Sequence, residues 1–197
     1  MPSNSNRPAR RLAVAATALA IAAAGGAGRA AAADWPDWRG PRRDGTSPET
    51  GLVATWSPAG EHLIWRADFV GRSTPVVFAG RVCATGQTGE DKTREEAAAC
   101  FDASSGEKLW ERRFPVYHTT VPWNRVGWAN PVADPETGYL YVQGVAGLLI
   151  CLDSRDGRTV WSRPLLEELG FMEGYGNRTQ TPIVNEDRLI VTFASSS

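Results

Sequence analysis

The chain has 197 residues, with 21 lysines and arginines against 22 aspartates and glutamates, and a formal net charge of −1. This length is enough for one or two ordinary domains. The balance of charge excludes the basic stripe with which a protein neutralises the phosphates of nucleic acid. No apolar run reaches the roughly 20 residues that a membrane-spanning helix needs.

Residues 1–33 are predicted to be a signal peptide. The start is basic, residues 12–24 are apolar, and Ala31-Ala32-Ala33 supplies the small residues of a cleavage site before Asp34. The segment carries four arginines and no acids, so its removal lowers the formal charge from −1 to −5. The general secretory route and the twin-arginine route, which Arg10-Arg11 would serve, both remain open. We therefore expect an exported protein in the periplasm, at the cell surface or outside the cell, with the signal peptide cleaved near Ala33.

Residues 34–62 are predicted to form an extended lead-in to the folded domain. Trp35 and Trp38, with Pro36 and Pro41 beside them, are typical of an extended and anchored segment. We expect this segment to pack across the edge of the domain that follows.

Residues 63–197 contain an internal repeat, which is the main signal for the fold. The lines CFDASSGEKLW, from Cys100, and CLDSRDGRTVW, from Cys151, share four residue types at the same offsets and lie 51 residues apart. Similar tryptophan lines occur at Trp65, Trp110 and Trp161, and proline lines occur at Pro75, Pro131 and Pro182. Because these landmarks interleave in a fixed order, the similarity predicts a repeated structural unit.

Each repeat reads as four short strands bounded by turn residues. The strands of the first repeat are predicted at residues 74–78, 81–85, 98–102 and 107–113, and those of the second at 131–133, 140–143, 148–153 and 158–163. A closing strand is predicted near Trp65, and half a repeat follows Pro182. The charged residues 86–96 are expected to be a solvated hairpin tip.

Three residue types recur at the turn between the third and fourth strands. The aspartate would accept hydrogen bonds from turn amides, the glycine would adopt a positive φ, and the tryptophan would pack against a neighbouring unit. Four-stranded sheets that stack around an axis bury the faces that a single sheet leaves exposed, which predicts an all-β fold, a β-propeller of four-stranded antiparallel blades. The residues with these structural roles are Asp102, Gly106, Trp110, Asp153, Gly157 and Trp161.

Two connections between blades, residues 115–130 and 167–181, are longer than the fold requires. Both join the last strand of one blade to the first of the next, so we expect them on the same face. Arginine and asparagine donors beside aromatic rings could hold a planar or anionic ligand, or could satisfy the carbonyls of the loops themselves. The candidate ligand-binding residues are Trp123, Asn124, Arg125, Trp128, Tyr175, Asn177 and Arg178.

No catalytic or metal-binding motif is visible in the sequence. There is no Cys/His metal spacing, no Gly-x-Ser-x-Gly elbow and no phosphate-binding glycine loop, so no catalytic residue and no metal ligand is assigned. The three cysteines, Cys83, Cys100 and Cys151, cannot all pair within one chain. We expect them to be small, buried, apolar residues.

The tryptophan lines resemble the pyrroloquinoline-quinone (PQQ) repeat, Ala-x-Asp-x-x-Thr-Gly-x-x-x-Trp, of the quinoprotein-like β-propellers, among them exported BamB-like repeat proteins. Cysteine replaces the alanine twice, and Ser105 and Asp156 stand where threonine is usual. The resemblance covers residues 63–193 and implies an eight-bladed ring, for which roughly 400 residues are needed. We therefore expect an incomplete propeller from a longer protein, with about two full blades and partial ones.

The leading hypothesis for function is an exported, non-catalytic β-propeller that serves as a scaffold or binding module. Its partner would be a protein or a small ligand on the loop face, not nucleic acid. The alternative that the resemblance implies is a PQQ-dependent oxidoreductase whose active site is completed by further blades. Such enzymes typically use an adjacent cysteine pair and a calcium site, and this sequence has no adjacent cysteines. No cofactor is evident from the residues, and PQQ is implied by resemblance only.

Overall fold

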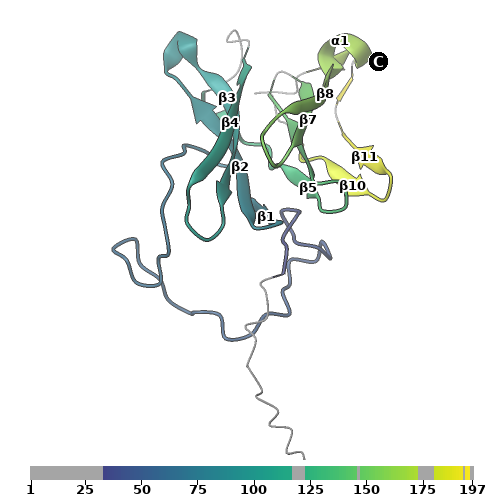
Figure 1. Ribbon diagram of the computed structural model, residues 1–197. Helices are drawn as coiled ribbons and strands as arrows, with labels where there is room; N and C mark the ends of the chain where they lie inside the picture. Colours follow the sequence, from purple (N-terminus) through teal and green to yellow (C-terminus); the bar gives the residue numbers. More distant parts are fainter. Residues whose placement is uncertain (1–32, 117–122, 146, 173–179, 193, 196–197) are drawn as a thin grey trace, which may run out of the picture. The chain divides into compact units, whose positions relative to one another are not determined.

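The computed structural model describes residues 33–116, 123–145, 147–172, 180–192 and 194–195, and their regular structure is mostly β (Figure 1). A short helix, α1 (Leu165–Leu169), follows the last strand of the second sheet. In these residues no helix is long and apolar enough to cross a membrane.

The first blade is a four-stranded antiparallel sheet whose strands lie side by side in chain order. Its strands are β1 (Val76–Phe78), β2 (Arg81–Thr88), β3 (Glu95–Asp102) and β4 (Lys108–Pro115). A short 3-10 helix, η1 (Asp91–Thr93), lies at the exposed tip of the β2–β3 hairpin. The alternation of side chains in β1, where Val76 and Phe78 are buried and Val77 is half-buried, turns one face of the sheet toward the core.

The second blade repeats this order with β5 (Val132–Asp134), β6 (Tyr139–Gln143), β7 (Leu148–Asp153) and β8 (Thr159–Pro164). A short 3-10 helix, η2 (Trp123–Arg125), lies between the two blades. Two further antiparallel pairs follow: β10 (Ile183–Asn185) with β11 (Arg188–Ile190), and β9 (Phe171–Met172) with β12 (Ala194–Ser195). The strands predicted for both blades are confirmed. β2 ends at Thr88 instead of residue 85, and β3 begins at Glu95 instead of residue 98, so both strands reach further toward the hairpin tip.

Both blades contain the same irregularity in the ladder of their last two strands. A β-bulge lies between Cys100 and Phe101 in β3, and another between Cys151 and Leu152 in β7. In each blade the repeated cysteine pairs with the repeated tryptophan, Cys100 with Trp110 and Cys151 with Trp161. The repeated sequence therefore corresponds to a repeated backbone path.

The turn after each bulge is fixed by its aspartate and its glycine. The Asp102 carboxylate accepts hydrogen bonds from the backbone N–H groups of Ser104 and Ser105, at 3.0 and 2.9 Å. The Ser104 hydroxyl, and after it the backbone N–H of Ser105, lowers the pKa of Asp102 to about 2. Gly106 closes the turn with a φ of 75°, a backbone conformation that residues with a side chain rarely adopt.

Two of the repeated tryptophans, Trp65 and Trp110, dock onto the turn of the blade that follows them. The Trp110 indole N–H donates to the carbonyl of Ser154 at 2.8 Å, and its ring covers Gly157 so closely that an added Cβ would lie 2.6 Å from it. Trp65 docks in the same way onto the first blade, with its indole N–H 2.9 Å from the Ala103 carbonyl. This packing of one blade against the next is that of a β-propeller, which confirms the predicted fold class.

The hydrophobic core extends through both blades. Val76, Phe78 and Cys100 of the first blade and Leu140 and Leu152 of the second are fully buried in one cluster. The start of the described chain, at Trp35 and Pro36, contributes to the packing as well. The backbone of Trp35 bridges to Val77 of β1, and the carbonyl of Pro36 accepts a hydrogen bond from the N–H of Ala133 in β5 at 2.8 Å. Trp38, by contrast, is half-exposed.

The strand predicted near Trp65 is not present. Residues 63–70 have no strand assignment, although exposed and half-buried side chains alternate along them as in a strand. A strand requires a hydrogen-bonded neighbour, and the described residues supply no ladder to this segment. Its tryptophan nevertheless docks as the repeat predicts.

The three cysteines are buried as expected, but two of them are not merely small apolar residues. Cys83 in β2 lies opposite Cys100 in β3, with the two Cα atoms 4.1 Å apart, and the two residues form a disulfide. The register of the hairpin brings them together, and the sequence spacing alone does not reveal it. Cys151 is a buried free thiol, and its burial raises its pKa to about 12.

Candidate functional site

The described part of the connection between the blades, Trp123–Asn130, is held against the first blade by backbone and side-chain contacts. The Thr85 hydroxyl donates to the carbonyl of Ala129. The backbone N–H of Thr74 donates to the side-chain oxygen of Asn130 at 2.7 Å. We refer to this segment as the inter-blade loop.

A close contact between two glycines holds the middle of the inter-blade loop. Gly127 has a φ of 68°, and a Cβ added to it would lie 2.2 Å from the carbonyl oxygen of Gly86 in β2. A Cβ on Gly86 would in turn meet the carbonyl oxygen of Val70 at 2.2 Å. Residues without a side chain are therefore needed on both sides of this contact, and the loop has little freedom to shift.

A buried glutamate ties the inter-blade loop to both blades. Glu96, in β3, has 5% of its surface exposed. One carboxylate oxygen accepts the N–H of Gly127 at 3.0 Å, and the other accepts the N–H of Val145, between β6 and β7, at 2.8 Å. Burial raises the pKa of Glu96 to about 7, while these two N–H groups act in the opposite direction.

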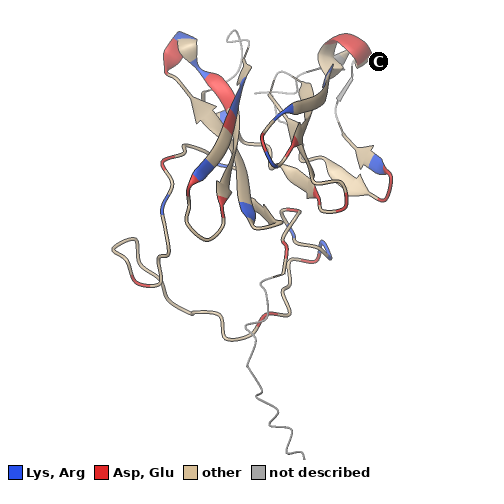
Figure 2. Cartoon of the chain, in the orientation of Figure 1, with Lys and Arg blue, Asp and Glu red and all other residues tan. Residues whose placement is uncertain are grey.

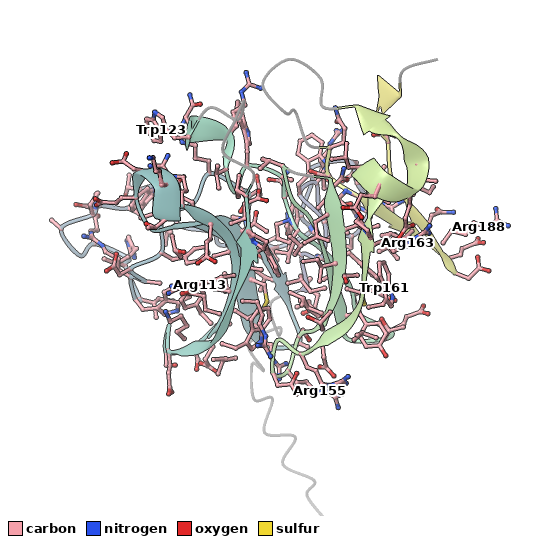
Figure 3. All side chains as sticks on the ribbon, turned by 90° about the horizontal axis from the view of Figure 1, so that it is seen from above. Arg113, Trp123, Arg155, Trp161, Arg163 and Arg188 are labelled. Atoms are coloured by element: carbon pink, nitrogen blue, oxygen red, sulfur yellow. A yellow bond between two sulfur atoms is a disulfide. The ribbon has the colours of Figure 1, made fainter. Side chains whose placement is uncertain are left out.

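Two exposed tryptophans on the inter-blade loop are in contact with arginines. The guanidinium groups of Arg72 and Arg94 both lie 5.5 Å from the ring centroid of Trp123, and that of Arg125 lies 5.0 Å from the centroid of Trp128. The exposed fractions of the two tryptophans are 58% and 47%. Cation–π contacts of this kind hold a ring and a charge in a fixed relation. Figure 3 shows Trp123 at the edge of the molecule, on the side away from Trp161.

The charges of these arginines are not neutralised by neighbouring carboxylates. Within the described residues, no carboxylate oxygen lies within ion-pair distance of Arg72, Arg94 or Arg125. The Nε atom of Arg94 and the Oδ1 atom of Asn124 are buried there without a hydrogen-bond partner. The surface beside Trp123 and Trp128 therefore carries positive charge that no carboxylate of the described residues balances.

The structure brings together only part of the predicted ligand-binding set. Trp123, Asn124, Arg125 and Trp128 lie on the inter-blade loop. Tyr175, Asn177 and Arg178 are outside the described residues, so the convergence of the two Asn-Arg pairs stays a prediction. Sequence reasoning missed Arg72, Arg94 and Glu96. Arg94 and Glu96 belong to the charged residues 86–96, which the sequence predicts to be a solvated hairpin tip. Residues 89–93 are exposed, but Arg94 is half-buried and Glu96 is buried.

A second candidate site lies at the other side of the second blade, around Trp161. This ring is 36% exposed, against 8% for the docked Trp110. It lines a cavity of about 600 Å³ together with Tyr141, Arg188 and Leu189, and an adjoining apolar cavity of about 510 Å³. Figure 3 shows Trp161 and Arg163 on the side of β8 that faces Arg188. Among the described residues, no group of three or more His, Cys, Asp or Glu side chains could hold a metal ion.

Comparisons with known proteins agree with the repeat. The model of the PQQ_2 family matches residues 94–196, which is more than half of the chain. The description of this family is outer membrane protein assembly factor BamB. No curated protein sequence matches the chain.

Three solved structures are similar to part of the chain. A europium-containing methanol dehydrogenase is 13% identical with a TM-score of 0.45, over 64% of this chain and 21% of its own length. The quinohemoprotein alcohol dehydrogenase from Comamonas testosteroni is 21% identical with a TM-score of 0.44, over 64% of this chain and 18% of its own. BamB from Moraxella catarrhalis is 15% identical with a TM-score of 0.35, over 62% of this chain and 41% of its own. The chain thus spans less than half the length of these proteins, and the likenesses concern the fold, not the activity.

Proposed function

Since the chain belongs to the PQQ_2 family, whose description is outer membrane protein assembly factor BamB, we propose that it is an exported β-propeller that works as a scaffold or binding module, without catalysing a reaction. Its partner contacts the face that carries the inter-blade loop. Family membership alone does not assign this role, because one fold serves many functions.

The observation that carries the proposal is the pair of exposed tryptophans held by arginines on a fixed loop. Exposed indole rings keep a large apolar surface in water, and burial of that surface by a partner is favourable. Tryptophan and arginine are also the residues most enriched among those that dominate binding energy in protein interfaces. Because the inter-blade loop is tied down by Glu96, Thr85 and Thr74, little conformational freedom would be lost on binding.

Export is part of the same proposal. It is supported by the basic, apolar and alanine-rich order of residues 1–33. The Cys83–Cys100 disulfide agrees with it, because structural disulfides persist in oxidising compartments and are rare in the cytosol.

The alternative, a PQQ-dependent oxidoreductase, is not favoured by any described residue. The resemblance implies an adjacent cysteine pair that contacts the cofactor. Here Cys83 and Cys100 are 17 residues apart and both are fully buried in the core of the first blade, where no ligand reaches them. The cysteines of this chain therefore do not fit that role.

A site-specific crosslinking experiment tests the proposal. The photoreactive residue p-benzoylphenylalanine would replace Trp123 in one variant of the full-length protein and Glu107 in a matched control. Glu107 is exposed and follows the turn at the opposite end of β3. We expect covalent partner adducts in the source cell from position 123 and none from position 107. The same adducts from both positions, or none from position 123, would refute the proposal.

A further inference from the structure

Acidic and basic side chains lie next to each other at the base and tip of the β2–β3 hairpin. Arg94 immediately follows η1, and Glu90, Asp91 and Glu95 surround it in sequence. In the described part of the chain none of these acids forms an ion pair with Arg94 or with Arg72. Figure 2 shows the two signs of charge side by side at this hairpin.

Two arginines, Arg72 and Arg94, lie beside the exposed ring of Trp123. Both guanidinium carbons lie 5.5 Å from the same ring centroid, so they are separated by no more than twice that distance. The N–H donors of a guanidinium group match the two oxygens of a carboxylate. Two guanidinium groups therefore lie beside one exposed ring, and no carboxylate of the described residues pairs with either of them.

We propose that this surface docks a protein segment of mixed charge. An aspartate or glutamate of the partner pairs with Arg72 and Arg94 beside Trp123, and a lysine or arginine of the partner pairs with the acids of the hairpin tip. This inference rests on the proposed function and specifies the chemistry of the partner at the same site.

The distribution of charge favours a protein segment over a polyanion. A sulfated glycan, a nucleic acid or an anionic membrane carries one sign of charge over a long surface, and Glu90, Asp91 and Glu95 would repel it. Alternating signs over a short distance are instead matched by acidic and basic side chains of a folded partner, because complementary potentials suppress wrong partners.

Direct binding of defined probes to the full-length protein tests the inference. The probes are fluorescent twelve-residue peptides in three forms, one with separate glutamate and lysine blocks, one with glutamate only and one with lysine only, together with heparin as a sulfated glycan. We expect fluorescence polarisation to show saturable binding of the mixed peptide that weakens with added salt. The all-glutamate peptide and heparin should bind at least tenfold more weakly.

Two sets of variants give the control. Arg72→Ala/Arg94→Ala should weaken binding of the mixed peptide at least tenfold, whereas Arg158→Ala, at an exposed arginine after the turn between β7 and β8 of the second blade, should leave it unchanged. Glu90→Gln/Glu95→Gln should narrow the preference for the mixed peptide over the all-glutamate peptide, because Asp91 is then the one acid of the three that still repels the all-glutamate peptide. Circular dichroism would establish that each variant is folded.

Three results would overturn the inference: no saturable binding of any peptide, heparin binding more tightly than the mixed peptide, or equal losses in the Arg158 and Arg72/Arg94 variants. The proposed function would survive each of these, since photocrosslinking from position 123 would still capture a partner of different chemistry. Absence of crosslinks from position 123 together with peptide binding would instead count against the proposed function alone.

Discussion

The indole ring of Trp110 lies on Gly157 of the next blade, so close that a Cβ on this glycine would be 2.6 Å from the ring. The ring is 8% exposed, and its N–H is satisfied by the Ser154 carbonyl. A large side chain of one blade therefore fills the turn of its neighbour and satisfies a backbone acceptor there. Several measurable consequences follow from this and other contacts.

Replacement of the docked tryptophan should weaken the fold far more than replacement of the undocked one. Trp110→Ala removes a buried aromatic side chain, for which a loss of about 3–5 kcal/mol in the free energy of unfolding is typical. Trp161→Ala, at the same place in the second repeat but 36% exposed, should cost about 1 kcal/mol. Urea unfolding followed by circular dichroism measures both. Equal losses of unfolding free energy in the two variants would mean that the packing of Trp110 onto the second blade does not stabilise the fold.

Gly157→Ala should destabilise the protein more than Gly138→Ala. Both glycines have a positive φ, 70° and 74°, so an alanine costs about 1–2 kcal/mol at either position from backbone strain. A Cβ at Gly138 meets open space, whereas one at Gly157 meets the ring of Trp110. We expect a further loss of about 1–3 kcal/mol for Gly157→Ala from overpacking. Thermal unfolding of the two variants isolates the docking contact, and identical melting temperatures would contradict it.

The stability of the protein should depend on pH through Glu96. Its pKa is raised from 4.5 to about 7, so between these values the folded state holds a proton that the unfolded state has lost. The free energy of unfolding contributed by this group is fully present below pH 4.5 and falls as the pH rises toward 7, by at most about 3 kcal/mol. Subtracting the pH profile of Glu96→Gln from that of the wild type measures this fall. A flat difference would show that Glu96 titrates as it does in the unfolded chain.

Thiol counting should distinguish the paired cysteines from the free one. Cys151 is buried, so the native protein should not react with Ellman's reagent, the protein denatured without reductant should show one thiol, and the reduced, denatured protein should show three. Replacing both Cys83 and Cys100 by alanine removes a link across 17 residues and should lower the free energy of unfolding by about 3 kcal/mol. Three thiols without reductant would exclude the disulfide.

The fold could be predicted because the residues that specify each blade lie close together in the sequence. The aspartate, the glycine and the tryptophan of each repeat act within one turn and on the next blade, so their spacing is enough to place the strands. The closing strand near Trp65 could not be settled in this way, because a strand also needs a neighbour. The Cys83–Cys100 pair depends on the register of a hairpin, which the sequence leaves open.

The candidate site could be predicted only in part, for a related reason. Trp123, Asn124, Arg125 and Trp128 are adjacent in sequence, and an aromatic and basic loop is visible there. Glu96 binds backbone N–H groups 31 and 49 residues away, and a backbone donor has no sequence signature. Arg72 and Arg94 reach Trp123 from other elements, so only the folded arrangement shows that the three belong together.

The docking of tryptophans also gives the structure a direction. The rings of Trp65 and Trp110 both dock forward along the chain onto a turn, a head-to-tail arrangement that between separate molecules leads to filaments rather than closed dimers. In the first blade the acceptor turn is already filled by Trp65 of the same chain, whose indole donates to Ala103. A second molecule would have to expel this ring before it could add there. The turn of the first blade is therefore occupied within its own chain, by the same contact that joins the first blade to the second.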